Sequence, residues 1–527
     1  ERVERARAAR ERVLVFGDFD ADGLSGLAIL VRVFRVLGID AAPYVPSRVD
    51  EGHGLSLGAV RAAVDAGRTL IVTVDCGTTS GPEIAAAAAL GIDVLVTDHH
   101  HVPVEIPPAL AVVNPHRPDS VYPDRRLTGS GVAFKVACLL LGERPEGARA
   151  ALDLADLAAI GTVSDMAPIV GENRSIARLG LERLRSAPRP GIAALLAQAG
   201  VAALDIDLET IGFTLAPRLN AAGRVGEAGQ AAALLLADDA EEAATLAAAL
   251  EVANSTRRDV TRQALLEVRA ALPVPMTSPA VVVRGPWPVG VVGLVAGRLA
   301  EELGRPVVVA AELDGVLRAS CRSAGGLDLA AALDRCGDLF IRHGGHAGAA
   351  GFEVASEQWA AFEERFLALA ADASIAARPR GLRLDLALPA GAVDYGLLGD
   401  LARLAPTGPG NPDPLVGVFG LTVQRIRAAT GGHTQLTLRR DIDVLDAIAF
   451  ERDDLVEALP EGSRVDVVAR LASRRFGGFE SLQLEIRDIA SAGYHVVAGA
   501  PSIEGGSGGA LGAGPIPIVL AAGSGDR

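Results

Sequence analysis

Cysteine is scarce in this sequence of 527 residues, which has only four, far apart and with no C-x-x-C pair: Cys76, Cys138, Cys321 and Cys336. This spacing argues against a zinc site and against a disulfide framework, and it favours a cytoplasmic protein. Long apolar runs are also missing, because charge, glycine or proline interrupts each stretch before it could cross a bilayer. We therefore expect no membrane span.

One common catalytic signature is absent. The sequence contains no Walker-type phosphate loop, and Lys135 is its only lysine, so we do not expect ATP hydrolysis. The chain has 65 acidic residues and 50 lysines and arginines, which gives a net charge of −15. This charge at first argues against a nucleic-acid partner. However, carboxylates that bind metal ions would add to this negative charge and be neutralised by the metal. The positions of the arginines are therefore more informative than the total charge.

What is present is enough for several globular domains. Half of the residues are apolar and 22% are charged, so the chain can bury sizeable cores. At about 150 residues per domain, the length suggests three or four of them. The sequence begins at Glu1 rather than methionine, and we expect it to be part of a longer protein.

The first part of the chain alternates short apolar strands with helices, which is typical of a parallel sheet covered on both faces. The predicted strands are 12–16, 69–74, 92–97 and 110–113, and the predicted helices are 23–37, 81–90, 132–141 and 152–162. From about 181 to 272 the pattern is almost purely helical, and 237–272 reads as a long connecting helix.

A second α/β unit begins at Ala280, with a predicted helix at 291–303 and a strand at 306–310. After Pro379 the pattern becomes β-rich, with strands near 382–388, 416–427, 433–440, 443–450 and 463–471, which suggests a small barrel of the OB type. The predicted divisions are 1–180, 181–275, 276–378, 379–495 and a Gly-rich linker or tail at 496–527.

Acidic residues follow three of the predicted parallel strands. The first strand runs into D-F-D-A-D-G, the second into D-C-G and the third into D-H-H-H. Because the carboxyl ends of parallel strands meet at one sheet edge, these side chains are expected to share a crevice. A further aspartate, Asp165, follows a helix in G-T-V-S-D.

Each of these aspartates could simply begin a turn or cap a helix. That explanation is poor for all of them together, because several unpaired carboxylates in one crevice repel each other and raise each other's pKa. A pair of divalent cations removes the repulsion. Oxygen and imidazole ligands suit Mn²⁺, with Mg²⁺ as the alternative, and two such ions would favour phosphoester hydrolysis.

The motifs D-F-D-A-D-G, V-D-C-G, D-H-H and G-T-V-S-D resemble the four metal motifs of the DHH phosphoesterase superfamily. Within it, the chain resembles the RecJ single-strand DNA 5′→3′ exonucleases along nearly its whole length. The resemblance implies a metal-binding set of Asp20, Asp22, Asp75, Asp98, His99 and Asp165.

The same resemblance implies individual roles. Asp75 would bridge two Mn²⁺ ions, and His100 would contact the scissile phosphate, so that Asp75, Asp98 and His100 are the predicted catalytic residues. Asp18 would support the loop. Phe16 stands where some relatives carry a metal-binding histidine, which leaves the ligands of the first metal open.

Arginine suits recognition of the DNA end, because its planar fork matches phosphate oxygens and keeps its charge. A lone arginine is usually only a solvated surface charge, but three segments combine arginine with polar or glycine neighbours: P-S-R-V-D-E-G-H-G-L, A-P-R-L-N-A-A-G-R and R-A-S-C-R-S. A fourth segment, H-G-G-H-A-G-A-A-G, supplies His346 among glycines that permit close approach of a ligand. By the resemblance, the last two belong to a DHH-associated domain. The predicted residues for DNA and 5′-phosphate binding are Arg48, Arg224, Ser320, Arg322 and His346, with Arg224 in a non-periodic turn.

The predicted barrel has few aromatics, among them Phe450, Phe476 and Phe479, so its arginines indicate backbone contacts more than base stacking. Those arginines are Arg425, Arg427, Arg439, Arg440, Arg474 and Arg475.

We therefore expect an α/β multidomain protein: a parallel-sheet DHH domain and a smaller α/β DHH-associated domain, joined by a long helix, plus a β-barrel OB-fold. The expected function is Mn²⁺-dependent 5′→3′ hydrolysis of single-stranded DNA to mononucleotides, in recombination and repair. A single-strand-binding protein or a helicase is the expected protein partner, recruited by segments outside this sequence.

Two alternatives remain at this point. One is a DHH phosphodiesterase of short oligonucleotides, against which the roughly 120 residues after Pro379 argue. The other is a catalytically silent DNA-binding scaffold, against which the retained acidic motifs argue.

Overall fold

The computed structural model describes residues 1–527 except 49, 143, 274, 324–325, 374–381, 477–478, 494–495, 498–515 and 520–527. The chain divides into two compact units, Glu1–Ala376 and Ala377–Arg527, each of which is described by itself. Within the described residues, no helix combines the length and the apolar character that crossing a membrane requires.

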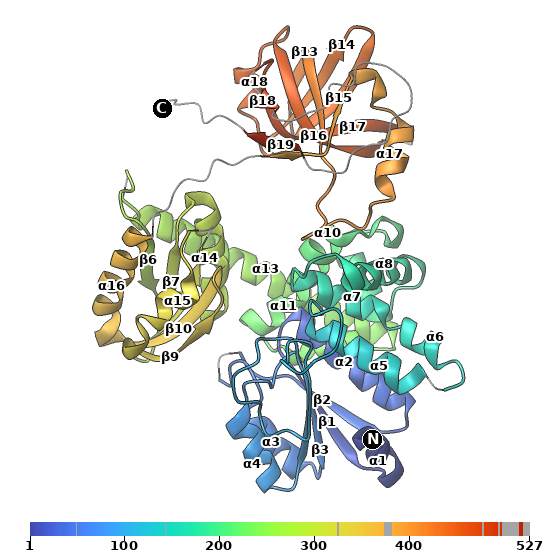
Figure 1. Ribbon diagram of the computed structural model, residues 1–527, viewed down its shortest axis with the longest axis vertical. Coiled ribbons are helices and arrows are strands. Elements are labelled where there is room, and N and C mark those ends of the chain that lie inside the picture. Colours follow the sequence, from blue (N-terminus) through green and yellow to red (C-terminus); the bar gives the residue numbers. More distant parts are fainter. Residues whose placement is uncertain are drawn as a thin grey trace. The chain divides into compact units, whose positions relative to one another are not determined.

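The first unit begins with a fully parallel five-stranded sheet in the order β2-β1-β3-β4-β5 (Figure 1). Its strands are β1 (Arg12–Gly17), β2 (Asp40–Tyr44), β3 (Leu70–Val74), β4 (Asp93–Thr97) and β5 (Ala111–Val113). The predicted parallel sheet is confirmed, with β2 as an additional edge strand that the sequence did not reveal.

Alternate residues of these strands enter two different cores. Val13 and Val15 of β1 pack into a core formed with α2 (Ala21–Val36), α5 (Gly129–Gly142) and α7 (Ala155–Ser164). Leu14 and Phe16 face the other side, where the core includes residues of α3 (Leu57–Asp65) and α4 (Gly81–Ala89). Helices on both faces explain why the strands are continuously apolar.

A helical region follows, and it leads to the predicted long helix. It comprises α8 (Gly171–Ser186), α9 (Pro190–Ala199), α11 (Ala216–Val225), α12 (Gly229–Leu236) and α13 (Ala240–Ala271). Asp239 caps α13 by accepting hydrogen bonds from the amides of Glu241 and Glu242. The 32 residues of α13 connect this region to the second α/β part.

The second α/β part contains a mixed sheet in the order β6-β7-β8-β10-β9, in which only β6 and β7 are parallel. Its elements are β6 (Val281–Gly285), α14 (Val289–Leu303), β7 (Val307–Leu313), β8 (Val316–Arg322), α15 (Leu329–Asp334), β9 (Phe340–Gly345), β10 (Ala349–Ala355) and α16 (Trp359–Asp372). Helix α14 and the end of α13 share one core with β6 and β7, while α15 and α16 share another with β8 and β10.

The second unit is a β-barrel, closed because β13 pairs with both β14 and β16. Its strands are β12 (Leu386–Leu388), β13 (Val416–Ala429), β14 (His433–Arg440), β15 (Asp443–Ala449), β16 (Arg464–Phe476) and β17 (Phe479–Ser491). The predicted barrel is confirmed, and β17 is a strand that the sequence analysis missed. The predicted tail lies largely outside the described residues, as do the side chains of Arg475, Phe476 and Phe479.

Candidate metal centre and phosphate-binding site

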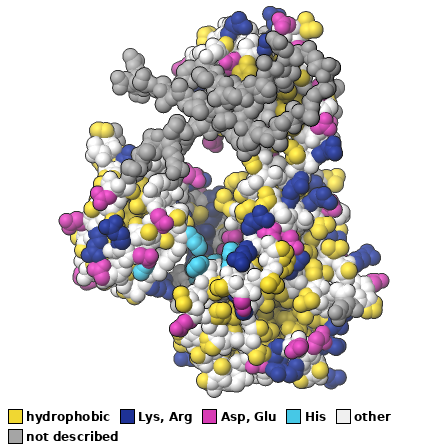
Figure 2. Space-filling model, in the orientation of Figure 1, with side chains coloured by type: hydrophobic (Ala, Val, Ile, Leu, Met, Phe, Trp, Pro, Cys, Tyr) yellow, Lys and Arg dark blue, Asp and Glu magenta, His cyan; other side chains and the backbone are white. Residues whose placement is uncertain are grey.

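The carboxylates and histidines that follow the strands of the parallel sheet lie together, as predicted. Three groups of side chains each place their ligand atoms within 4.8 Å of one another. The groups are Asp75, His99 and His100; Asp22, His99 and Asp165; and Asp18, Asp20 and Asp75. Figure 2 shows histidine side chains at the surface of the first unit, several of them close to one another.

Asp75 is at the centre of this cluster. It directly follows β3, adopts a left-handed backbone conformation with φ 62°, and is only 3% exposed. Its Oδ1 lies 3.0 Å from Nε2 of His99, yet this buried oxygen accepts no well-directed hydrogen bond from any described residue. Burial, followed by the charges of Asp22, Asp20, Asp18 and Asp98, raises the pKa of Asp75 well above its usual range.

His99 lies among carboxylates from three separate segments. Its Nε2 is 3.0 Å from Asp75 Oδ1, 3.9 Å from Asp22 Oδ2 and 4.0 Å from Asp165 Oδ2. Burial lowers the pKa of this histidine despite the acidic neighbours, while burial and the charges of Asp22 and Asp20 raise the pKa of Asp165. A neutral imidazole beside unsatisfied carboxylates is a suitable donor set for divalent cations.

Asp22 and Asp20 are held by helix N-termini. The Asp22 carboxylate accepts hydrogen bonds from the amides of Gly129 (2.6 Å) and Ser130 (3.0 Å) at the start of α5. Asp20 caps α2, since its Oδ1 accepts from the amides of Asp22 and Gly23. These backbone donors fix the direction of both carboxylates before any ligand binds.

Asp98 differs from the other predicted ligands, because both of its oxygens have protein partners. Oδ2 accepts from the amide of Thr78 at 3.0 Å, and Oδ1 accepts from the amide of His99 at 2.7 Å and lies 2.8 Å from Nδ1 of His100. Burial alone would raise the pKa of Asp98, but these bonds lower it below the usual range. The same contact raises the pKa of His100 to about 9. Asp98 thus orients His100. The role of Asp98 as a metal ligand stays a prediction.

The donor set fits divalent metal ions. Two buried carboxylate oxygens, Asp18 Oδ1 and Asp75 Oδ1, have no hydrogen-bond partner among the residues that the structure describes. Leaving such atoms buried and unpaired is costly, and a cation within the cluster would remove the cost. Phe16 contributes no donor atom, since it is fully buried and stacks on Tyr44 with ring centroids 5.6 Å apart.

Three of the predicted phosphate-binding arginines are near one another. Burial, followed by the charges of Arg48, Arg257 and other neighbours including Arg322, lowers the pKa of Arg224 to about 9. Arg224 lies in the last turn of α11, so its prediction in a non-periodic turn was wrong. Its Nη1 donates a hydrogen bond to the carbonyl of Gly290, which lies in the first turn of α14. Buried positive charges that repel one another form a suitable site for an anion.

Ser320 and Arg322 belong to β8, and both approach α14 at Gly293. A Cβ added to Gly293 would lie 3.3 Å from Ser320 Oγ and 3.3 Å from an Arg322 terminal nitrogen, so the helix passes close to both side chains. His346 is exposed, and its amide bonds the carbonyl of Ala349 within a tight turn. Among the described residues, the His346 side chain forms no hydrogen bond with the other predicted phosphate-binding residues. The role of His346 therefore stays a prediction.

Sequence reasoning missed several residues that build the centre. His53 has Nδ1 3.0 Å from Asp18 Oδ2, Asn220 accepts a 2.7 Å hydrogen bond from the amide of Ala21, and Asn114 bonds both Thr78 and the carbonyl of His100. Asn220 and His53 stand within the arginine segments quoted above, which is a usable signal. Asn114 had no comparable signal.

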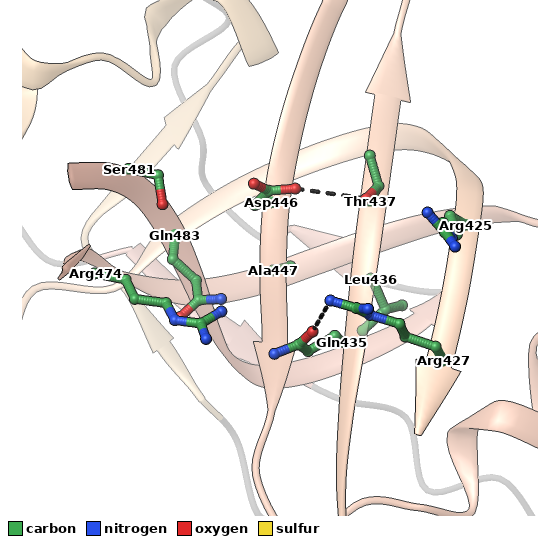
Figure 3. Close-up of a pocket in the computed structure, with 10 residues that line it drawn as sticks. All are labelled: Arg425, Arg427, Gln435, Leu436, Thr437, Asp446, Ala447, Arg474, Ser481 and Gln483. Carbon is green, nitrogen blue, oxygen red and sulfur yellow. Dashed lines mark hydrogen bonds between the residues drawn. The ribbon is translucent and has the colours of Figure 1, made fainter. Parts of the chain in front are cut away.

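The face of the barrel carries a separate polar pocket (Figure 3). Arg425 and Arg427 come from β13, Gln435 from β14, Arg474 from β16 and Gln483 from β17. Arg427 donates to Gln435 at 2.6 Å. No aromatic side chain lines this pocket among the described residues, so it suits a charged backbone better than stacked bases. Of the barrel aromatics named above, Phe450 is 46% exposed and packs edge-on against His433.

Comparison with known proteins places these features in context. Family models match the DHH family N-terminal domain at residues 12–162, the DHHA1 domain at 278–372 and the RecJ OB domain at 384–488. The chain is 34% identical to the single-stranded-DNA-specific exonuclease RecJ of Bacillus subtilis, over 93% of this chain and 62% of that protein. It therefore spans less than two thirds of that relative's length.

Two further relatives are covered more fully. The chain is 36% identical to the RecJ exonuclease of Thermus thermophilus, over 92% of this chain and 70% of that protein. It is 35% identical to the RecJ exonuclease of Escherichia coli, over 91% of this chain and 87% of that protein. The structure resembles the crystal structure of Thermus thermophilus RecJ in complex with Mn²⁺, with a TM-score of 0.78, 33% identity and coverage of 93% of this chain and 70% of that chain. A structure of the same protein with Mg²⁺ has a TM-score of 0.71, 32% identity and coverage of 92% and 68%.

Proposed function

The chain belongs to the RecJ family of single-stranded-DNA-specific exonucleases, and from this premise we propose that it is a divalent-metal-dependent nuclease that releases mononucleotides from the 5′ end of single-stranded DNA. The observation that carries the proposal is the buried Asp75 oxygen, which lies 3.0 Å from His99 Nε2 and has no hydrogen-bond donor among the described residues. A cation bound between these atoms would make the arrangement favourable in the folded protein.

We propose that the metal-binding residues are Asp20, Asp22, Asp75, Asp98, His99 and Asp165, with Asp18 as a further candidate because it belongs to one of the three ligand groups. The ions would be Mn²⁺, or Mg²⁺ as the alternative, since structures of a relative contain each of them. When bound, such ions supply Lewis-acid stabilisation of phosphoryl oxygens and make water nucleophilic at neutral pH.

The chain's own residues then position the substrate. His100 has Nδ1 engaged by Asp98, which leaves Nε2 as the nitrogen that can meet a phosphoryl or leaving oxygen. Arg48, Arg224, Ser320 and Arg322 would bind the 5′ phosphate, and His346 would approach the same strand. This arrangement would place the first phosphodiester beside the carboxylate cluster and so define 5′→3′ polarity.

We propose that the barrel binds the strand further along. Arg425 and Arg427 supply positive charge in a pocket without aromatic lining among the described residues, which supports contacts to the backbone and little sequence preference. The match to the RecJ OB domain at 384–488 counts against a phosphodiesterase limited to short substrates.

The wider context is proposed on the same premise. The domain division at 1–180, 181–275, 276–378 and 379–495 is supported by the three family matches. A cytoplasmic location, a role in recombination and repair, and recruitment by a single-strand-binding protein or a helicase follow from the family membership.

Single-stranded oligonucleotides labelled at either end test the proposal, with Mn²⁺ and either wild-type or Asp75→Ala protein. We expect early release of labelled mononucleotide only from the 5′ end, and none from the variant. Cleavage from the 3′ end, or unchanged cleavage by the variant, would contradict the proposal. Binding without cleavage by the wild type would favour a silent scaffold.

A further inference from the structure

The loop that carries Arg48 packs on an aromatic side chain of the first metal motif. The guanidinium carbon of Arg48 lies 4.0 Å from the centroid of the Phe19 ring. The His53 ring, from the same loop as Arg48, packs against Phe19 with centroids 4.4 Å apart. Phe19 is fully buried and stands between Asp18 and Asp20 in the sequence.

Arg48 donates no hydrogen bond to any residue that the structure describes. Among the residues that the structure describes it has no hydrogen-bond partner, and its Nε is buried. Burial lowers the pKa of Arg48, although the charges of Asp18 and Asp20 oppose the shift. A buried Nε–H without an acceptor is unfavourable unless a ligand supplies one, while the half-buried side chain leaves the terminal nitrogens within reach of a ligand.

The two carboxylates whose charges act on Arg48 each have another partner, although Asp18 Oδ1 stays unpaired among the described residues. Asp18 Oδ2 lies 3.0 Å from Nδ1 of His53, and Asp20 Oδ1 accepts from the first amides of α2. Neither forms an ion pair with Arg48 in this structure. A carboxylate in that position would bind the guanidinium fork and compete with a phosphate, whereas an aromatic face holds the cation without using any N–H donor.

We propose that Phe19 is the positioning residue for Arg48, and that a cation–π contact, instead of an ion pair, holds this arginine ready for a terminal phosphate. The inference rests on the proposed function and deepens it. Because Phe19 lies between two metal-motif aspartates, the contact also fixes the distance from the bound end to the cleavage site. Recognition of the 5′ phosphate and the position of cleavage are thereby linked through one ring.

Fluorinated phenylalanines at position 19 test this inference in the full chain. Mono-, di- and trifluorination progressively weaken the negative ring face while nearly preserving its shape. We measure kcat/KM on matched oligonucleotides ending in 5′ phosphate or 5′ hydroxyl, and we take the ratio as the phosphate preference. The same fluorinated phenylalanines at position 34 give the matched control, because Phe34 belongs to α2 and is buried in the core.

We expect the phosphate preference to fall stepwise, by about fivefold to thirtyfold at trifluorination, which corresponds to the usual range of desolvated cation–π contacts. The fall should appear in KM, should be absent for Phe34, and should vanish in an Arg48→Ala background because Phe19 acts through Arg48. Melting temperatures and Mn²⁺ affinity should stay unchanged.

An equal loss on both substrates, or a fall that persists with Arg48→Ala, would overturn the inference. So would wild-type protein that cleaves both substrates equally well, although its exonuclease activity would then still stand. Wild-type protein that cleaves neither substrate would refute the proposed function itself, which keeps the two failures distinct.

Discussion

Gly129, the first residue of α5, is the position where the smallest change should most damage the metal centre. A Cβ added there would lie 2.4 Å from Asp75 Cβ, 2.6 Å from its Oδ1 and 2.7 Å from its Cγ. Carbon atoms in contact normally lie 3.5–4.0 Å apart, so Gly129→Ala must move one of the two segments by about 1 Å.

Neither segment can move without affecting the candidate ligands. Asp75 is fixed by its left-handed backbone and by a 2.9 Å hydrogen bond from its amide to the carbonyl of Thr97. The start of α5 is fixed because the amide of Gly129 donates to Asp22 at 2.6 Å. The added methyl group therefore moves either Asp75 away from His99 or the start of α5 away from the Asp22 carboxylate.

We expect Gly129→Ala to lower kcat/KM at least about 100-fold, since a 1 Å displacement of reacting groups costs that much. Overpacking should destabilise the first unit by about 1–3 kcal/mol, which leaves it folded. The assay is release of 5′-labelled mononucleotide at saturating Mn²⁺, with circular dichroism to confirm folding.

Gly142, at the other end of the same helix, provides the matched control, because a Cβ there would meet nothing within 4 Å. Gly142→Ala should keep wild-type activity and should be neutral or slightly stabilising. If Gly129→Ala retained wild-type kcat/KM and Mn²⁺ affinity, the reasoning about the geometry around Asp75 would be refuted.

Three further predictions follow from the same geometry. Asp75→Asn removes the burial and repulsion that raise the pKa of the Asp75 carboxyl and destabilise the folded state, so it should raise the melting temperature of metal-free protein by about 2–4 °C while abolishing cleavage and the stabilisation that Mn²⁺ gives; a lower melting temperature without metal would contradict this. Asn220→Ala leaves the amide of Ala21 without its acceptor, so stability should fall by about 1–3 kcal/mol in urea unfolding and cleavage should slow, with Asn220→Asp restoring part of both. Arg425→Ala combined with Arg427→Ala should weaken single-strand binding and reduce the slope of log K against log salt by about 1.4; Arg452→Ala, whose side chain pairs with Asp454, should leave that slope unchanged.

The sequence predicts the large elements well, because their patterns are strong. Strands β1, β3 and β4 are continuously apolar, and α13 carries a long helical pattern with an Asp239 cap. The edge strand β2 was missed because its sequence D-A-A-P-Y contains proline and no alternation. Strand β17 was missed although L-Q-L-E-I-R alternates apolar and polar residues, which is a usable strand signal.

The sequence could predict which residues form the candidate site, because the carboxyl ends of parallel strands meet at one sheet edge. It could not predict the hydrogen-bond partner of each side-chain atom. No sequence pattern indicates that both carboxylate oxygens of Asp98 would form hydrogen bonds, with Thr78, His99 and His100 as the partners. The contact of Phe19 with Arg48 joins residues 29 positions apart in non-periodic segments. Such contacts depend on loop geometry, which local sequence does not determine.

The central proposal is that Asp75 and the carboxylates around it would hold two divalent ions in one centre. Electron paramagnetic resonance of Mn²⁺-loaded protein tests it most directly, with the metal content measured on the same sample. We expect two Mn²⁺ per chain with the spectrum of a spin-coupled pair, and loss of the coupling in Asp75→Ala. Uncoupled Mn²⁺ in a wild-type sample that degrades single-stranded DNA from its 5′ end would contradict the account.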